Sequence, residues 1–302
     1  MEREALYTEL ENIVGAARLR RNAPMKEYTS FKVGGPADCL AEPAGEEELA
    51  AALALLARTQ TPHFVMGNGT NLLVRDQGYP GVVLRLGEAF SAVEAEGERI
   101  RAGAGALLAS VAARAAEAGL QGLEFASGIP GSMGGALFMN AGAYDGEMSR
   151  VTEEVRVMAR DGSRTDTLGA AEMGYGYRKS ALMETGAVVL SAVLKLEPGD
   201  PAAIRAQMRE LAARRNAKQP VSLPSAGSFF KRPEGNFAGK LIQDAGLKGL
   251  SRGGARVSPL HAGFIVNEGD ATAQDIIDLM KVVQTAVYQR FGVRLEPEVR
   301  II

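Results

Sequence analysis

The sequence has one cysteine, no tryptophan and only two histidines among its 302 residues. Because Cys39 is alone, no disulfide can form within the chain, which fits a reducing compartment. His63 and His261 have no second Cys or His at ligand spacing, so we expect no metal site. No run of about eighteen apolar residues occurs, which excludes a membrane-spanning helix. Residues 1–7 also lack the apolar stretch of a secretory signal.

An excess of one charge is lacking too, since 34 Lys and Arg residues face 36 Asp and Glu residues, a net charge of -2 at pH 7. This balance argues against a broad nucleic-acid surface but allows a local basic pocket for a phosphorylated small molecule. Hydrophobic residues make up 46% and charged residues 23%, as is usual for a globular protein. We expect a cytoplasmic protein with small-molecule partners, no nucleic acid and no membrane insertion, for which an oligomer is not required.

Hydrophobic periodicity divides the chain into three parts of mixed α and β structure, expected at residues 1–90, 91–200 and 201–302. The four-residue run from Pro198 to Pro201 marks the second boundary. The Asp161-Gly162 pair predicts a hairpin. Helices are predicted over 2–20, 46–58, 107–117, 202–216, 237–244 and 273–291, and strands or extended segments near 28–36, 64–66, 72–74, 82–84, 99–101, 155–159, 188–196, 264–266 and 293–300.

A short loop with two glycines, Gly67-Asn68-Gly69-Thr70-Asn71, lies between two predicted strands. Closely spaced glycines let the backbone approach a ligand, and successive N–H groups can cradle a pyrophosphate. The loop is not the G-x-G-x-x-G fingerprint, because no third glycine opens a helix. A plain Gly-Asn hairpin turn explains the same residues, so the loop by itself leaves both interpretations open.

A second and denser glycine-rich stretch runs from residue 128 to residue 146. So many small residues weaken a packed core unless something flat and close-fitting needs the room. A dinucleotide cofactor lying along the backbone supplies such a reason. A run of tight turns joining helices is the alternative.

Three polar residues are ambiguous when each is read alone. Ser228, in a Gly-Ser-Phe-Phe-Lys turn, could donate a proton or cap the turn. Arg178 could bind a carboxylate through two hydrogen bonds or remain solvated. Glu298 could point inward from its strand-like tail or face solvent. No Gly-x-Ser-x-Gly elbow occurs, so an α/β-hydrolase has no support.

Six short motifs follow one another from about Thr29 to the C-terminus. They are Thr29–Gly35, Gly67–Asn71, Gly128–Ser132, Gly176–Ser180, Gly227–Lys231 and Leu295–Arg300. Taken together and in order, they resemble the UDP-N-acetylenolpyruvoylglucosamine reductases, a family of flavoenzymes. Any single motif is a weak match, but all of them in the family's order are very specific.

The resemblance implies a vanillyl-alcohol-oxidase-like (PCMH-type) FAD-binding fold in two α/β parts, with a C-terminal α/β substrate-binding domain. It implies NADPH-dependent, FAD-mediated reduction of UDP-N-acetylglucosamine enolpyruvyl ether to UDP-N-acetylmuramate. That reaction belongs to peptidoglycan precursor synthesis, and so to cell-wall biogenesis, cell shape and cell division. NADPH would use the cleft of the sugar nucleotide at a different time. The spacing from Arg178 to Val188 is too short for the tyrosine-bearing loop of one branch, so the chain resembles the shorter branch.

The resemblance also implies roles for individual residues. The catalytic arginine, serine and glutamate fall on Arg178, Ser228 and Glu298. Bound FAD would be non-covalent, because neither glycine-rich stretch holds a histidine or cysteine to attach it. FAD contacts are implied for Gly67, Asn68, Gly69, Thr70, Asn71, Gly128, Ile129, Pro130, Gly131, Ser132, Gly134, Gly135, Asn140, Ala141, Gly142 and Ala143. Substrate contacts are implied for Tyr177, Arg215, Lys218, Lys231, Lys248 and His261, the last at a position where some members have glutamine.

Two other functions stay open at this point. Another oxidoreductase on the same flavin fold, such as a sugar-lactone or alcohol oxidase, would explain the glycine-rich stretches but not the motifs around Ser228 and Glu298. A non-catalytic nucleotide- or flavin-binding protein would need none of the three catalytic candidates, all of which are intact.

Overall fold

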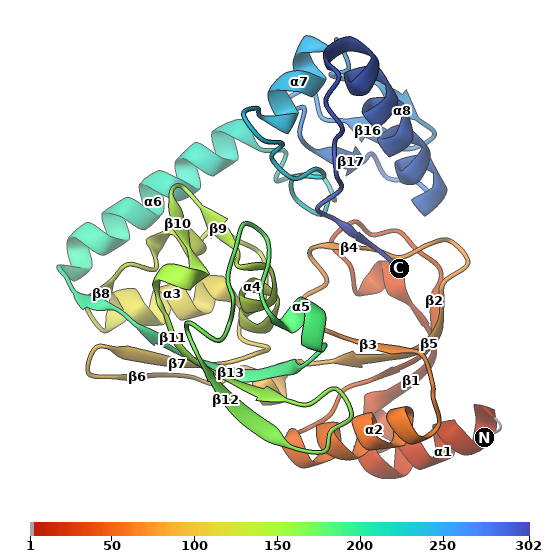
Figure 1. Cartoon of the computed structure of the whole chain (residues 1–302), viewed down its shortest axis with the longest axis vertical. Helices are drawn as coiled ribbons and strands as arrows, with labels where there is room; N and C mark the ends of the chain where they lie inside the picture. The colour runs from red at the N-terminus through yellow and green to blue at the C-terminus, as the bar shows by residue number, and fades with distance from the viewer. Residues whose placement is uncertain (1–2) are drawn as a thin grey trace. The chain divides into compact units, whose positions relative to one another are not determined.

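The chain folds into two compact units in the computed structural model, which describes residues 3–302 (Figure 1). Unit 2 collects two short segments from the N-terminal half of the chain together with the C-terminal third. The three-part division drawn from the sequence stays a prediction. Unit 1 comprises Met1–Asn22, Cys39–Asn68 and Pro80–Ala213, and unit 2 comprises Ala23–Asp38, Gly69–Tyr79 and Arg214–Ile302.

Helices and strands are mixed along the chain, with runs of consecutive strands between the helices. Those of unit 1, including the few that continue into unit 2, are α1 Arg3–Val14, β1 Leu19–Pro24, β2 Pro36–Ala41, α2 Glu46–Arg58, β3 His63–Met66, β5 Tyr79–Arg85, β6 Val93–Glu96, β7 Arg99–Gly103, α3 Leu108–Glu117, β8 Leu120–Gln121, α4 Met133–Met139, β9 Gly142–Ala143, β10 Gly146–Glu147, β11 Thr152–Met158, β12 Thr165–Gly169, α5 Leu182–Thr185, β13 Val188–Lys195, β14 Glu197–Pro198 and α6 Pro201–Lys218. Those of unit 2 are β4 Leu72–Leu73, α7 Ala238–Asp244, β15 Ser251–Arg252, β16 Ala255–Val257, β17 Ile265–Asn267, α8 Ala273–Phe291 and β18 Arg300–Ile301.

Unit 1 is built on two sheets. Four strands pair in the order β1-β2-β5-β3, with β3 parallel to β5, and five antiparallel strands pair in the order β12-β11-β13-β7-β6. Helices α3 and α4 pack on one face of the five-stranded sheet (Figure 1). One continuous cluster of buried apolar side chains extends from α1 through both sheets. The sheets therefore share a core, which gives the loops between their strands a rigid support.

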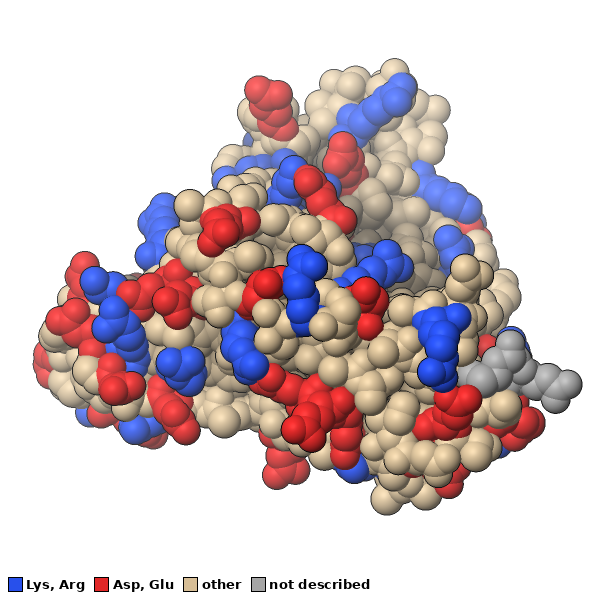
Figure 2. All heavy atoms as spheres, turned by 60° about the horizontal axis from the view of Figure 1, so that its bottom comes forward, with Lys and Arg blue, Asp and Glu red and all other residues tan. Residues whose placement is uncertain are grey.

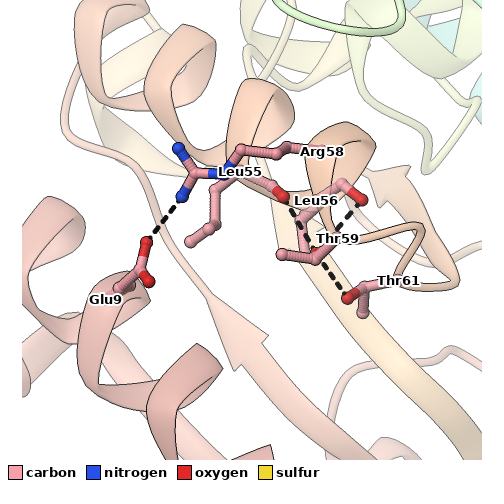
Figure 3. A network of polar contacts seen from close by, with 6 residues as sticks. All are labelled: Glu9, Leu55, Leu56, Arg58, Thr59 and Thr61. Carbon is pink, nitrogen blue, oxygen red and sulfur yellow. Dashed lines mark hydrogen bonds and ion pairs between the residues drawn. The ribbon is translucent and has the colours of Figure 1, made fainter. Parts of the chain in front are cut away.

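Helices α1 and α2 lie in the N-terminal part of unit 1 and pack against each other. Arg58, in the last turn of α2, forms an ion pair with Glu9 of α1, with Nη2 and Oε2 2.8 Å apart (Figure 3). The Thr59 hydroxyl donates to the carbonyl oxygen of Leu55 at 2.9 Å and lies 2.7 Å from the Thr61 hydroxyl. These hydrogen bonds satisfy polar groups at the end of α2, where the last backbone carbonyl oxygens have no partner within the helix. The chain then continues into β3.

Unit 2 has its own core, in which the aromatic rings of Phe31, Phe229 and Phe230 meet. Helix α8 packs on β15 and β16 and begins with a reciprocal capping box between Thr272 and Asp275. The C-terminal strand β18 pairs in parallel with β4, far earlier in the chain. This pairing brings the segment that carries the Glu298 motif next to the loop that follows Gly69.

The structure confirms most of the predicted elements, corrects two of them and adds one helix. Helices α2 and α8 have the predicted bounds. The helix predicted over 2–20, whose first residue lies outside the described part, ends at Val14 because Gly15 takes a φ of 82°. The strand predicted over 28–36 is wrong, since that segment consists of turns and β2 begins at Pro36. Helix α4, inside the second glycine-rich stretch, was not predicted.

The surface carries charges of both signs. Figure 2 shows Lys and Arg side chains interspersed with Asp and Glu over the face drawn. Many charged side chains of the described residues are paired, as Arg99 is with Glu153, with Nε and Oε2 2.6 Å apart. Every helix within residues 3–302 is too short or too polar to cross a membrane.

Candidate active site

The two predicted cofactor loops meet within unit 1. Asn68 Nδ2 donates to the carbonyl oxygen of Pro130 at 2.7 Å. A Cβ atom placed on Gly67 would overlap the Ser132 side chain, so only glycine permits this approach of the loops. The structure therefore brings together the start of the Gly67–Asn71 loop and the Gly128–Ser132 loop, which lie about sixty residues apart in the sequence.

These loops present backbone donors that the chain itself does not use. A Cβ added to Gly135 would make only an ordinary van der Waals contact, with the Ser132 hydroxyl oxygen at 3.6 Å. Consecutive unpaired N–H groups in such loops attract anions, and the pyrophosphate of a dinucleotide is a suitable one. The residues present thus fit FAD. Within residues 3–302, no hydrogen bond is donated by the backbone N–H groups of Gly67, Asn68, Gly128, Gly131, Ser132 or Gly135.

The remainder of the first loop belongs to unit 2 and lies against the C-terminal segment. Asn71 Nδ2 donates to the carbonyl oxygen of Glu298 at 3.2 Å, and the N–H of Arg300 donates to the carbonyl oxygen of Asn71 at 3.0 Å. On the other side, the Ser30 N–H donates to the carbonyl oxygen of Gly69 at 3.2 Å. Gly69–Asn71 is thereby tied to the backbone that carries a catalytic candidate.

Ser228 and Glu298 are brought together within unit 2 by a short antiparallel pairing. The N–H of Glu298 donates to the carbonyl oxygen of Phe229 at 2.8 Å, and the N–H of Lys231 donates to that of Glu296 at 2.9 Å. Phe229 is completely buried next to Ser228, whose own side chain is exposed. Burial of the phenylalanine fixes the backbone, so the serine hydroxyl and the Glu298 carboxyl are held on adjoining segments.

Arg178 lies in unit 1, in a tight turn with a left-handed backbone of φ 53°. Its Nη2 donates to the carbonyl oxygen of Gly142 at 3.3 Å, and its guanidinium carbon lies 5.2 Å from the centre of the Tyr177 ring. Tyr177 itself is 53% exposed. The arginine is therefore presented on a fixed turn beside residues expected to line a flavin.

The predicted basic substrate contacts occupy separate elements. Arg215 and Lys218 lie in the last turn of α6. Lys231 pairs with Glu296, with Nζ and Oε2 3.3 Å apart, and Lys248 Nζ donates to Gln243 Oε1 at 3.3 Å. Because Glu296 and Gln243 are exposed, Lys231 and Lys248 lose little free energy when a ligand replaces these partners.

His261 is the best-defined member of this group. Burial lowers the pKa of its imidazole, and the nearby Lys248 ammonium lowers that pKa further. Its Nδ1 accepts a hydrogen bond from the Gly263 N–H at 3.1 Å, and its ring meets Phe264 edge-on with centroids 5.0 Å apart. Neutral His261 therefore carries its proton on Nε2, where it can donate to an acceptor.

The structure also points to residues that sequence patterns missed. Gln219 Oε1 is a buried side-chain oxygen without a hydrogen-bond partner within residues 3–302, directly after Lys218. Such an oxygen is a candidate acceptor for a ligand donor. No sequence signal distinguishes this glutamine from a solvated one.

Comparison with known proteins shows the family and the domains of the chain. Residues 219–302 match the family model for the C-terminal domain of UDP-N-acetylenolpyruvoylglucosamine reductase, and residues 37–167 match an FAD binding domain. A UDP-N-acetylenolpyruvoylglucosamine reductase of Clostridium botulinum is 49% identical over 96% of this chain and 95% of its own. One from Clostridioides difficile is 46% identical over 100% of this chain and 99% of its own.

Solved structures support the fold. The crystal structure of UDP-N-acetylenolpyruvylglucosamine reductase from Thermus caldophilus has a TM-score of 0.82 and 40% identity, over 94% of this chain and 98% of that one. A glucose dehydrogenase, at 14% identity and a TM-score of 0.51 over 96% of this chain and 63% of that one, shares the fold alone. The predicted two-part FAD-binding fold with a C-terminal domain is confirmed. The chain belongs to the UDP-N-acetylenolpyruvoylglucosamine reductase family.

Proposed function

We propose that this chain catalyses the NADPH-dependent, FAD-mediated reduction of UDP-N-acetylglucosamine enolpyruvyl ether to UDP-N-acetylmuramate, in cytoplasmic peptidoglycan precursor synthesis. The observation that carries the proposal is near-full-length identity of 46% to 49% with reductases of that name, in a chain that keeps all three catalytic candidates. Bound FAD would supply the hydride chemistry that links NADPH to the enol ether. The unused donors of Gly67, Asn68 and the Gly128–Gly135 stretch would hold its pyrophosphate.

Arg178 would bind the carboxylate of the enolpyruvyl group. The double bond of this group is conjugated to the carboxylate, so hydride addition at its terminal carbon leaves enolate-like charge on the rest. A planar guanidinium can stabilise that negative charge by donating two parallel hydrogen bonds to the carboxylate. The hydrogen bond from Arg178 Nη2 to the carbonyl oxygen of Gly142, at 3.3 Å, helps to orient the guanidinium. A preorganised cation of this kind stabilises the transition state more than the ground state.

Ser228 and Glu298 would complete the reaction on the same substrate molecule. The Ser228 hydroxyl would deliver a proton to the carbon that gains charge, and Glu298 would position or polarise the enolic group. A serine hydroxyl is a weak acid, but an enolate-like carbon is a much stronger base. The pairing of the Phe229 and Glu298 backbones supports a joint role for the two residues.

The sugar nucleotide carries a diphosphate that needs cationic and neutral donors. Arg215, Lys218 and Lys248 offer positive charge, and the His261 Nε2–H offers a neutral donor. Lys231 and Tyr177 would complete the substrate contacts. The Glu296 partner of Lys231 is exposed and easily exchanged, and Tyr177 is itself exposed.

NADPH consumption with and without the UDP-sugar enolpyruvyl ether tests the proposal. We expect rapid oxidation of NADPH only in the presence of the ether, with one NADPH used for each product molecule. A rate that does not respond to the ether would contradict the proposal. Reduction of the flavin by a sugar lactone or an alcohol, followed by its reoxidation with oxygen, would favour an oxidase on the same fold instead.

The proposal also predicts that FAD is held without a covalent bond. Gly67–Asn71 and Gly128–Tyr144 contain no histidine or cysteine, and the single cysteine, Cys39, is completely buried. Acid precipitation should therefore leave the yellow colour in the supernatant. Colour retained in a washed, denatured pellet would contradict non-covalent binding.

A further inference from the structure

The turn that presents Arg178 needs external support. Arg178 has a left-handed backbone, which residues with a side chain rarely adopt unless their surroundings impose it. The turn closes on itself, since the Gly176 N–H donates to the carbonyl oxygen of Lys179 at 3.1 Å and the Lys179 N–H donates back at 3.2 Å. Two such bonds define the loop but do not attach it to the rest of unit 1.

Asn140 supplies an attachment. It follows the last residue of α4 with a φ of 43° and a ψ of 58°, a left-handed conformation that asparagine tolerates well. Its side chain is 1% exposed. Nδ2 donates to the carbonyl oxygen of Gly176 at 3.0 Å, and Oδ1 accepts from the Ser149 N–H at 2.9 Å. Both ends of the amide are thus engaged with the protein, one of them directly on the arginine turn.

Two neighbouring contacts fasten the same turn to the same segment. The buried Ser180 hydroxyl donates to the carbonyl oxygen of Phe138 at 2.7 Å. Arg178 Nη2 donates to the carbonyl oxygen of Gly142 at 3.3 Å. Residues 138–142 therefore contact the turn at three places, and the Asn140 side chain provides the central one.

We propose that Asn140 is a positioning residue that holds the Arg178 turn in its strained conformation. Its side-chain amide is committed to Gly176 and Ser149, so the FAD contact implied for Asn140 falls to its backbone, and the side chain acts through the shape of the turn. Helix α4 begins directly after the Gly128–Ser132 loop and ends at Met139, immediately before Asn140. One short helix thereby connects a predicted cofactor loop to the arginine turn. That Arg178 binds the substrate carboxylate rests on the proposed function, whereas the attachment of its turn by Asn140 does not.

Hydrogen exchange tests the attachment without any ligand or activity. Asn140→Gly keeps the left-handed backbone, which glycine adopts freely, and removes both amide bonds. We expect the amides of residues 176–180 to exchange about tenfold faster in this variant than in the wild type. Asn22→Gly is the matched control, because Asn22 has a φ of 50°, is exposed and makes no side-chain hydrogen bond within residues 3–302. It should leave exchange at residues 176–180 unchanged.

A double-mutant cycle tests whether Asn140 acts through Arg178. We expect Asn140→Gly to lower kcat/KM for the enolpyruvyl ether about tenfold in the wild type and to cause no further loss in an Arg178→Ala background. Asn140→Asp is a second variant, which keeps the acceptor for Ser149 and replaces the donor to Gly176 with a repelling oxygen.

The outcomes separate the possibilities. Unchanged exchange at residues 176–180 in both Asn140 variants would overturn the proposal. Equal losses of kcat/KM with and without Arg178 would overturn it as well, because Asn140 would then act elsewhere. If the wild-type protein does not oxidise NADPH in response to the ether, the proposed function fails, while the exchange measurement still decides whether Asn140 holds the turn.

Discussion

Asp76 and Ala273 are 197 residues apart in the sequence, yet Asp76 Oδ1 accepts a hydrogen bond from the Ala273 N–H at 2.8 Å. Its other oxygen accepts from the N–H of Gln274, also at 2.8 Å. The Thr272 hydroxyl accepts from the next N–H, that of Asp275, at 3.0 Å. The donors that open α8, which have no partner inside the helix, are thereby all satisfied. Asp76 joins the segment after the Gly67–Asn71 loop to the longest helix of unit 2.

Replacement of Asp76 by alanine should therefore destabilise unit 2. Loss of a capping carboxylate leaves two helix N–H groups unsatisfied, and we expect the free energy of unfolding to fall by about 1–2 kcal/mol. Urea denaturation followed by circular dichroism measures this change. Asp166→Ala, which removes an exposed carboxylate paired with Arg164, is the control and should cost less than about 0.5 kcal/mol. Equal losses in the two variants would show that the Asp76 contact does not stabilise the helix.

The variant Arg178→Lys tests whether substrate reduction needs the planar guanidinium group of Arg178. Lysine keeps the positive charge but cannot form two parallel hydrogen bonds with a carboxylate. We expect kcat/KM for the enolpyruvyl ether to fall roughly 10²-fold while bound FAD keeps its normal absorbance spectrum. Arg160→Lys, at an exposed position of unit 1, is the matched control and should turn over normally. Wild-type turnover by Arg178→Lys would mean that Arg178 is a surface or structural residue.

Removal of the Ser228 hydroxyl should affect only one half of the reaction. Flavin reduction by NADPH needs no proton on carbon, so anaerobic bleaching should proceed at nearly the wild-type rate in Ser228→Ala. Recolouring on addition of the enolpyruvyl ether should slow by about 10²–10⁴-fold, the usual effect of losing a general acid. Stopped-flow absorbance records both steps on one sample, and Ser222→Ala, in the preceding exposed loop, serves as control. If both steps slowed equally, Ser228 would shape the fold or the flavin site; if neither slowed, the proton would come from elsewhere.

His261 should make stability depend on pH below neutrality. Burial holds the pKa of His261 below its ordinary value of 6.5, so the unfolded chain binds a proton more readily than the folded one. Stability should be full above about pH 6.5 and should decline as the pH falls from there toward the lowered pKa of the folded state. His261→Gln should flatten this decline, as measured by urea denaturation across that range. His63→Gln removes the other histidine as a control, and an unchanged slope in His261→Gln would contradict the assignment.

The segment after Thr29 shows why one local pattern misled. Its aromatic and β-branched residues favour a strand, but a Cβ on Gly34 would lie 2.7 Å from the carbonyl oxygen of Val74, and one on Gly35 would overlap the backbone of Asp76. The segment turns closely against residues 74–78 of unit 2, with Lys32 at a φ of 58°. Contacts with a distant part of the chain override strand propensity here. The glycines signal the close approach, but their neighbours cannot be identified from the sequence.

The sequence by itself determined the helices with clear periodicity and caps, and the ordered motifs that place the chain in its family. Helix α8 follows from its apolar spacing and from Thr272 and Gly292 at its ends. Tertiary structure alone decided that Glu298 lies beside Phe229, that Asp76 caps α8 and that Asn140 holds the Arg178 turn. The physical reason is the distance along the sequence over which each interaction acts. Helix propensity and capping act over a few neighbouring residues, whereas these hydrogen bonds join segments whose meeting depends on the path of the whole chain.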